Sequence, residues 1–260
     1  MILGGNKISK VDQNKILNNL NGKKYFYKLI NLKPNVKIYL DGNSHFCLYN
    51  LGKNEYNLEY KQLQKYILND IVISKNCKAS IQSKKSTRLL YCGKKSKNKT
   101  PKIIFKKRNA IYKVNKPWGY ELWLASKENQ AKFAMKEIFI KSGFKTSFQF
   151  HEKKEECNYI INGTGKFYIS EKKINLSKFK KNKYSNRDLK EIIKNLRVFK
   201  LKKGSSFYIK PLYVHSVLST KNLLMMESST LELDDVYRIF DESGRGHGRI
   251  SSEHKNDNSK

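Results

Sequence analysis

The sequence lacks any apolar run long enough to cross a membrane, because no stretch approaches the roughly 18–20 residues that a spanning helix needs. Its N-terminus also lacks the basic start and the longer apolar run of a signal peptide. The four cysteines are scattered without a Cys-x-x-Cys pair, so neither a zinc knuckle nor a disulfide framework is indicated. We therefore expect a cytoplasmic protein with reduced thiols and no membrane partner.

Arginine is scarce as well. The chain has 54 basic and 22 acidic residues and a formal net charge of +32, but only seven of the basic residues are arginine and the other 47 are lysine. A basic surface gains affinity for nucleic acid by releasing counterions from phosphates. Dedicated nucleic-acid surfaces, however, usually concentrate arginine for its forked donors and its stacking on bases. We predict no specific nucleic-acid partner, and a general attraction to anions that includes sugar phosphates.

The 260 residues are enough for one large or two modest domains. Residues 94–108 carry a lysine run, a Thr-Pro and little to bury, which favours a linker or an exposed connection. Short β-rich runs separated by Gly, Asn and Lys turns predict a mostly-β N-terminal unit over residues 1–105. Within it, residues 69–93 resemble the second half of a cupin without its histidines. The unit is therefore either a degenerate first cupin, which would make the chain a bicupin, or a β extension of another kind.

The second part of the chain, residues 106–255, has stronger strand signals. About nine short runs of aromatic and β-branched residues lie between residues 120 and 228. Their number and spacing predict an all-β, double-sheet jelly-roll barrel. A charged insertion at 171–196 interrupts the strands, and Ser185 offers an N-cap to a helix whose apolar residues fall on one face.

The segment from residue 143 to residue 163 carries the chemistry. It fits the first cupin motif, G-x5-H-x-H-x(3,4)-E-x6-G, with Gln149 in place of the first histidine. Residues i and i+2 of a strand point to the same side of a sheet, so Gln149 and His151 should both face the barrel interior. Glu156 should enter the next strand aimed at the same point. Asn162-Gly163 is a strong hairpin signal that should close the following turn.

Residues 204–215 resemble the second cupin motif, G-x5-P-x-G-x2-H, and end in His215. The proline stands one place late, at Pro211, and Leu212 occupies the usual glycine position, so we expect an altered turn that preserves the ligand. Gln149, His151, Glu156 and His215 form a mixed N/O set suited to one divalent first-row ion, namely Zn, Mn, Fe, Co or Ni. Open coordination positions would accept water or substrate oxygens. The alternative is a cupin that kept these residues but binds sugar without a metal.

Three segments together narrow the resemblance. Residues 116–121 (KPWGYE) resemble the RPWG-type segment of the type II phosphomannose isomerases, which also form the C-terminal half of the bifunctional mannose-1-phosphate guanylyltransferases. The metal motif of that family, Q-x-H-x4-E, matches residues 149–156, and its tail element, DD-x-x-R-x-x-D-x-x-GR, matches residues 234–245. The resemblance covers residues 114–250, about half of the chain. The first 105 residues are too short for a guanylyltransferase domain.

The resemblance implies a metal-dependent aldose–ketose isomerase, similar to mannose-6-phosphate isomerase, that acts on a phosphorylated or acidic sugar in activated-sugar or surface-polysaccharide metabolism. The candidates for proton transfer are Glu227 and Lys136, each of which has a salt-bridged structural role as its alternative. Arg245 would bind phosphate or stabilise the enediolate with its fork, unless it forms an ion pair with Asp234 or Asp241.

Two other classes of function stay open. A sugar-nucleotide epimerase would keep the barrel and change the substrate, but we find no obvious His–Asp dyad with a tyrosine acid. A non-catalytic sugar-binding or regulatory cupin would more often carry a helix-turn-helix, and none is apparent. The sequence leaves open the metal, the sugar and the assembly, for which a homodimer is the candidate.

Overall fold

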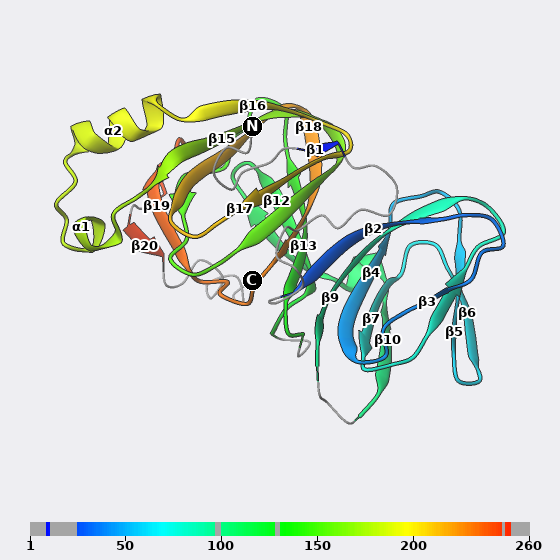
Figure 1. The fold of residues 1–260 in the computed structure, drawn as a ribbon. Coiled ribbons are helices and arrows are strands. Elements are labelled where there is room, and N and C mark those ends of the chain that lie inside the picture. The colour runs from blue at the N-terminus through cyan, green and yellow to red at the C-terminus, as the bar shows by residue number, and fades with distance from the viewer. Residues whose placement is uncertain (1–8, 11–24, 97–99, 128–130, 246–247, 251–260) are drawn as a thin grey trace. The chain divides into compact units, whose positions relative to one another are not determined.

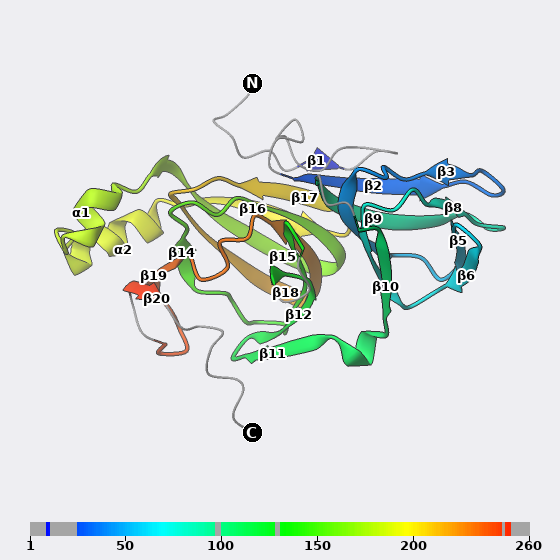
Figure 2. The ribbon, with the colours of Figure 1, turned by 90° about the horizontal axis from the view of Figure 1, so that it is seen from below.

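The computed structural model describes residues 9–10, 25–96, 100–127, 131–245 and 248–250, and they form an all-β fold with a few short helices (Figures 1 and 2). The fold class predicted from the sequence is confirmed. The elements are β1 (Ser9–Lys10), β2 (Phe26–Leu32), β3 (Ile38–Tyr39), β4 (Ser44–Asn50), β5 (Tyr56–Tyr60), β6 (Leu63–Ile67), β7 (Ile71–Lys75), β8 (Ser80–Gln82), β9 (Thr87–Lys95), β10 (Lys102–Lys106), the 3-10 helix η1 (Arg108–Ala110), β11 (Tyr112–Lys116), β12 (Gly119–Ala125), β13 (Ala134–Ile140), β14 (Phe148–Phe150), β15 (Glu156–Lys173), α1 (Leu176–Lys180), α2 (Asn186–Lys194), β16 (Arg197–Lys202), β17 (Ser205–Ile209), β18 (Tyr213–Ser229), β19 (Val236–Phe240) and β20 (Gly248–Ile250). None of the helices in the described part of the chain has the length and apolarity to span a membrane.

The chain forms two compact units. The first, called the N-terminal unit below, comprises residues 11–112 and 123–136, and the second, called the C-terminal unit, comprises residues 1–10, 113–122 and 137–260. The domain boundary predicted after residue 105 stays a prediction.

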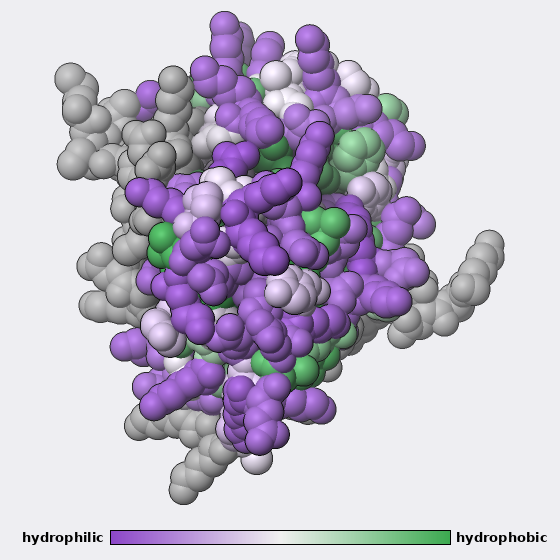
Figure 3. Space-filling view, turned by 90° about the vertical axis from the view of Figure 1, so that its right-hand side faces the viewer, coloured by the Kyte–Doolittle hydropathy of each residue, from purple (hydrophilic) through white to green (hydrophobic). Residues whose placement is uncertain are grey.

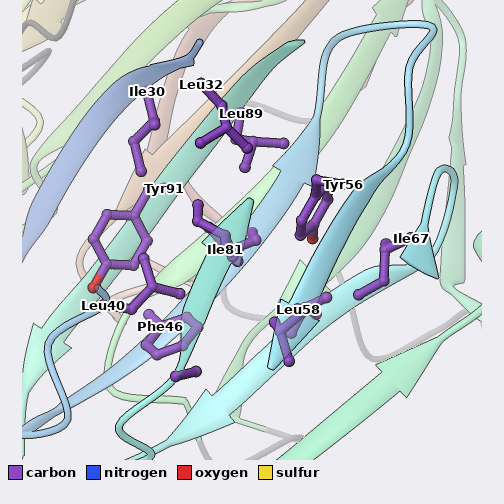
Figure 4. Close-up of a cluster of buried hydrophobic side chains, with 13 residues drawn as sticks. Ile30, Leu32, Leu40, Phe46, Tyr56, Leu58, Ile67, Ile81, Leu89 and Tyr91 are labelled. Atoms are coloured by element: carbon purple, nitrogen blue, oxygen red, sulfur yellow. The ribbon is translucent and has the colours of Figure 1, made fainter. Parts of the chain in front are cut away.

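The N-terminal unit is a jelly roll. One sheet has the order β10-β7-β4-β9-β2 and the other has the order β3-β8-β5-β6, so each early strand pairs with a late one. Eight strands paired in this way, β2 to β9, are the arrangement of a double Greek key. Large apolar side chains such as Phe46, Tyr56, Leu58 and Ile81 are fully buried in its core (Figure 4). The molecular surface on the side of β3, β5 and β6 is largely hydrophilic, with scattered apolar side chains (Figure 3). The prediction of a mostly-β N-terminal unit is confirmed.

The prediction of a linker over residues 94–108 is wrong for residues 94–95, which end β9, and for residues 102–106. Residues 102–106 form β10, which pairs antiparallel with β7 from Lys102↔Lys75 to Lys106↔Ile71. Ile103 and Phe105 are partly buried against the core of the N-terminal unit. The apolar side chains between the lysines therefore bury enough surface for this segment to form a strand at the edge of the sheet.

Two long strands dominate the C-terminal unit. β15 and β18 pair along most of their length through four register irregularities and curl around a common interior (Figures 1 and 2). The first half of β15 also pairs with β17 and the second half with β16, so each half serves a different part of the barrel wall. This unit is the predicted jelly-roll barrel.

The hairpin predicted at residues 162–163 does not form. β15 continues through this point, where its register against β18 shifts between Ile160 and Asn162 and again between Asn162 and Thr164. Gly163 has a φ of 87°, and a Cβ there would lie 2.2 Å from the carbonyl oxygen of Asn222. The Asn-Gly pair thus marks an irregularity within a paired strand, because the neighbouring strand approaches too closely for a side chain.

The charged insertion is present as predicted. Ser185 caps α2 through a capping box, in which its hydroxyl accepts from the Asp188 N–H at 3.1 Å and the Asp188 carboxylate accepts from the Ser185 N–H at 2.8 Å. The ring of Phe179 from α1 contacts the ring of Phe150 edge-on, with centroids 5.0 Å apart. The insertion therefore packs on the side of β14 that Phe150 faces, and alternation puts Gln149 on the opposite side.

Candidate metal centre

Three of the four predicted ligands converge in the barrel of the C-terminal unit. His151 follows β14, Glu156 begins β15 and His215 lies on β18, and one ligand atom from each lies within 4.8 Å of the other two. All three are buried, with exposures of 1%, 5% and 4%. The end of β14, the start of β15 and the more distant β18 thus place an N/N/O set at one point inside the barrel.

Gln149 lies beside this group. Its Cα is paired with that of His215 across β14 and β18, so the two side chains share a face of the sheet. Its Oε1 accepts a hydrogen bond from the Ser147 hydroxyl at 2.8 Å. The position suits a fourth ligand, and its participation stays a prediction.

The two imidazoles are oriented as metal ligands usually are. Nδ1 of His215 donates to the Tyr213 carbonyl at 2.9 Å, and Nδ1 of His151 donates to the Asp235 carbonyl. The proton on each Nδ1 leaves a lone pair on each Nε2. These two Nε2 atoms are buried without a hydrogen-bond partner and face Oε1 of Glu156, at 3.7 Å from His151 and 3.3 Å from His215. Two buried lone pairs beside a carboxylate are what a divalent cation would satisfy, so the residues present fit the implied ion.

A buried lysine completes the centre. Nζ of Lys154 lies 2.7 Å from Oε2 of Glu156 and 2.8 Å from Oε1 of Glu227, and its side chain is 5% exposed. Burial acts to lower the pKa of Lys154, but the two carboxylates outweigh it and raise that pKa above its ordinary value. Lysine is rarely buried unless paired, and nothing in the motif spacing distinguishes this lysine from its neighbours, so the sequence did not indicate it.

The surroundings of His151 and Glu156 favour the deprotonated form of each. Burial and the Lys154 charge lower the pKa of His151 below its usual value. Burial acts to raise the pKa of Glu156, but Lys154 and the two imidazoles hold it well below the usual range. Metal binding requires neutral imidazoles and an ionised carboxylate, and the shifts of His151 and Glu156 both act in that direction.

The loop between His151 and Glu156 is held by Asp235, which belongs to the acidic tail element. The Asp235 carboxylate accepts hydrogen bonds from the backbone N–H groups of Glu152 at 2.9 Å, Lys153 at 2.5 Å and Lys154 at 2.9 Å. Its carbonyl also accepts from His151. The tail element therefore fixes the conformation of the ligand loop, a role that sequence reasoning did not assign to it.

The three predicted catalytic residues lie in different surroundings. Glu227 joins the metal centre through Lys154. The Arg245 guanidinium contacts the Asp241 carboxylate, with Nη2 at 2.5 Å and Nε at 3.1 Å from Oδ2.

Lys136 lies on β13 with its Nζ 4.1 Å from the centroid of the Trp123 ring, a cation–π contact within the N-terminal unit. Of the three, Glu227 is joined to the ligand Glu156 through Lys154. The catalytic roles of all three stay predictions.

One further cation shares the ligand face. On β19, Arg238 is the cross-strand neighbour of Gln149 and is 3% exposed. His215, Gln149 and Arg238 therefore form one row across β18, β14 and β19. The tail motif in the sequence contains Arg238, but its spacing alone does not show that the residue stands beside the ligand strand.

The turn before His215 differs from the usual motif as expected. Leu212 stands where glycine is usual and adopts a φ of 70°, a left-handed conformation that glycine reaches more easily. Its N–H donates to the His151 carbonyl at 2.7 Å, and its own carbonyl accepts from the Ile174 N–H at 2.8 Å. These two hydrogen bonds hold the turn that precedes His215.

No known protein-family model matches the sequence, and no curated protein does so either. Solved structures do match. An IolB-like protein from Salmonella typhimurium has a TM-score of 0.65 at 10% identity, covering 88% of this chain and 93% of its own. Protein YlbA from Escherichia coli has a TM-score of 0.62 at 10% identity, covering 88% and 92%. Bacillus subtilis oxalate decarboxylase, which contains Mn(II) centres, has a TM-score of 0.59 at 10% identity, covering 91% and 78%.

Likeness at such low identity shows the fold alone. It extends over both compact units, since each match covers nearly nine tenths of the chain or more. The comparisons therefore show a cupin-type jelly-roll fold, and the narrower resemblance to phosphomannose isomerases stays a prediction. With its jelly-roll strand pairing and its His/Glu group, the chain has the cupin fold.

Proposed function

We propose that the protein is a metal-dependent isomerase that interconverts the aldose and ketose forms of a phosphorylated or acidic hexose. The observation that carries the proposal is the position of Glu227. It is a second buried carboxylate, 6% exposed, joined through Lys154 to the ligand Glu156. An isomerase of this type needs a cation for the substrate oxygens and a base beside it, and the centre offers both.

His151, Glu156 and His215 would hold the ion, with Gln149 as the fourth ligand. The mixed N/O set favours Zn, Mn, Fe, Co or Ni. When bound, the ion would supply Lewis-acid polarisation of the sugar carbonyl. The proposal covers any of these five ions.

Glu227 would move the proton between carbons. It would remove the proton from C2 of the aldose and return it to C1, while the hydroxyl proton passes from O2 to O1, so that aldose and ketose keep the same formula. The Lys154 ammonium, 2.8 Å away, would hold the carboxylate in place for both transfers. Lys136 is the second candidate for the proton transfer and is tested beside Glu227.

Arginines would recognise the charged end of the substrate. Arg238 lies in one row with His215 and Gln149 and would present its fork toward an anion in the barrel. Arg245, which now contacts Asp241, would bind the phosphate or carboxylate of the substrate in place of the Asp241 carboxylate. Both assignments rest on the isomerase proposal.

The test is exchange of solvent deuterium into the sugar. Metal-loaded protein is incubated in D2O with mannose 6-phosphate, fructose 6-phosphate and related acidic sugars, and label at C1 and C2 is followed by NMR. Glu227→Gln should keep the metal and lose about 10²–10⁴-fold in exchange, the usual contribution of a general base. Lys136→Met is the comparison variant, and a larger loss there would transfer the role to Lys136.

The other classes of function give different results in the same assay. Label that enters a sugar nucleotide but not a sugar phosphate would favour a sugar-nucleotide epimerase. A sugar that binds without any exchange would favour a non-catalytic or regulatory cupin. If the loaded wild-type protein exchanges no deuterium into any sugar phosphate or acidic sugar, the isomerase proposal fails.

A further inference from the structure

The sheet β3-β8-β5-β6 of the N-terminal unit has one face in the core and a second, polar face. Along β5, Leu58 is fully buried in the core, and Asn57 and Glu59 point the opposite way. The strand register extends this polar face across three strands as two rows, Gln82–Asn57–Tyr66 and Ser80–Glu59–Gln64. Amides, a carboxylate, a hydroxyl and an aromatic ring thus lie side by side on rigid strands.

A cavity of about 490 Å³ lies on this face. Asn57, Glu59, Gln64, Tyr66 and Gln82 line it. Loops add Glu55 and the lysines Lys53, Lys84 and Lys85 to its wall. The surface on this side of the molecule is predominantly hydrophilic (Figure 3).

Asn57 has an acceptor that the protein does not use. Its side chain is 8% exposed, and its Nδ2 donates to Oε1 of Glu59 at 3.3 Å. The other oxygen of Glu59 accepts hydrogen bonds from Lys37 at 2.6 Å and from Ser80 at 3.2 Å. These two bonds hold the carboxylate, and the carboxylate in turn orients the Asn57 amide. Oδ1 of Asn57 is buried without a hydrogen-bond partner. Such an atom calls for a donor from a ligand or a water molecule.

The charges around the cavity narrow the chemistry of the ligand. An anion would meet the carboxylates of Glu55 and Glu59 and the free acceptor of Asn57. A cation would be repelled by the three lysines that line the cavity, and the carboxylate of Glu59 is already paired with Lys37. A neutral molecule with hydroxyl donors and an apolar face satisfies the site best, since Tyr66 offers a ring that is 53% exposed.

We propose that this face of the N-terminal unit is a binding site for a neutral saccharide. A sugar hydroxyl would donate to Oδ1 of Asn57, and the ring would lie on Tyr66. Gln64 and Gln82 would supply further amide contacts across the two rows. The site is separate from the metal centre, and the proposal does not depend on the isomerase activity.

The experiment uses the full chain in EDTA, so that no metal contributes. Saturation-transfer NMR with maltotriose, cellotriose, laminaritriose and chitotriose identifies a bound sugar, and calorimetric titration gives its Kd. We expect at least one trisaccharide to bind. Asn57→Leu, which removes the free acceptor at similar size, and Tyr66→Ala should each raise the Kd about tenfold or more, and a tenfold change corresponds to about 1.4 kcal/mol. Phe144→Ala removes a 46% exposed aromatic ring of the C-terminal unit and should leave the Kd unchanged.

Two results would overturn the proposal. One is that none of the four trisaccharides binds the wild-type protein. The other is that a sugar binds with unchanged affinity to both Asn57→Leu and Tyr66→Ala. Loss of binding in His151→Ala would then place the sugar in the barrel of the C-terminal unit. Thermal melting checks each variant, and because Tyr66 is exposed, its substitution keeps the test valid even if Asn57→Leu proves unstable.

Discussion

Lys154 approaches Oε2 of Glu156 at 2.7 Å, whereas the imidazoles of His151 and His215 approach Oε1 of the same carboxylate. The ligand carboxylate is therefore held from one side by a fixed positive charge and presents its other oxygen to the metal position. Asp235 holds the backbone of the same loop through three N–H groups. The ligand set is preorganised by residues that would not themselves touch the ion.

Replacing Lys154 by methionine should destabilise the metal-free protein strongly. Glu156 and Glu227 would be left buried without their cation, and breaking one partner of a buried pair typically lowers the free energy of unfolding by about 3–5 kcal/mol. Chemical denaturation in EDTA measures the change. The control is Lys178→Met, because Lys178 pairs with Asp188 at the surface, where both side chains are 43% exposed, and such surface pairs contribute about 0–1 kcal/mol.

A double variant tests whether charge imbalance is the cause. Adding Glu227→Gln to Lys154→Met removes one of the two buried negative charges and should recover part of the lost stability. Glu227→Gln is also made alone, and its effect on the free energy of unfolding is measured. If it lowers the free energy of unfolding by the same amount in the wild-type protein and in Lys154→Met, the lysine acts through packing of its stem and not through its charge.

Protein purified without chelator should carry about one first-row divalent ion per chain. Because His151 supplies a buried lone pair to the group, His151→Ala should lose most of this metal. Elemental analysis by mass spectrometry gives the stoichiometry. Glu152→Gln is the matched control, since Glu152 lies in the same loop but bonds to Tyr237 and Lys180. Metal that survives in His151→Ala would contradict this ligand assignment.

The approach of His151 to Glu156 was predictable because their spacing is local. Gln149 and His151 are two residues apart and should share a face of the sheet, and the next strand begins at Glu156 after a short loop. The partner of Glu156 was not predictable in this way. Lys154 is one of four consecutive charged residues that follow Glu152, and only the packed barrel shows that it points inward.

The N-terminal unit shows why a jelly roll without polar ligands is hard to recognise from sequence. By strand pairing, Ile38 and Ile81 on β3 and β8 occupy the places that Gln149 and His215 hold on β14 and β18. Ile81 is fully buried, and Ile38 and Leu40 belong to the same apolar core. The strand pairing of a jelly roll is present, but apolar side chains fill its interior. The sequence of this unit therefore contains no polar motif by which the fold could be recognised.

Arg245→Lys should separate a substrate-binding role from a structural one. Lysine keeps the charge but loses the fork. If Arg245 binds the substrate anion, isomerase turnover should fall, approaching the roughly 10²–10³-fold loss typical of removing one donor from an anion-stabilising site, with little change in melting temperature. Asp241→Asn is the companion variant, because it removes the present partner of Arg245. A lowered melting temperature with intact turnover in both variants would make the pair structural.

The last prediction concerns Phe150, which links the insertion to the metal centre. It is fully buried between Gln149 and His151, is stacked on Tyr237 with ring centroids 4.9 Å apart, and meets Phe179 edge-on. Phe150→Ala should lower the free energy of unfolding by about 3–5 kcal/mol, as large-to-small changes of buried aromatics do.

Phe150→Ala should also weaken metal binding although no ligand is altered, because the strand that carries His151 loses its packing on one side. Denaturation in EDTA and metal titration by calorimetry measure the two effects separately. Val198→Ala on β16 is the control, since Val198 is 52% exposed and its truncation should change neither quantity. If Phe150→Ala loses stability but binds metal as tightly as the wild-type protein, the loop clamp of Asp235 positions His151 by itself, and the insertion serves only the stability of the barrel.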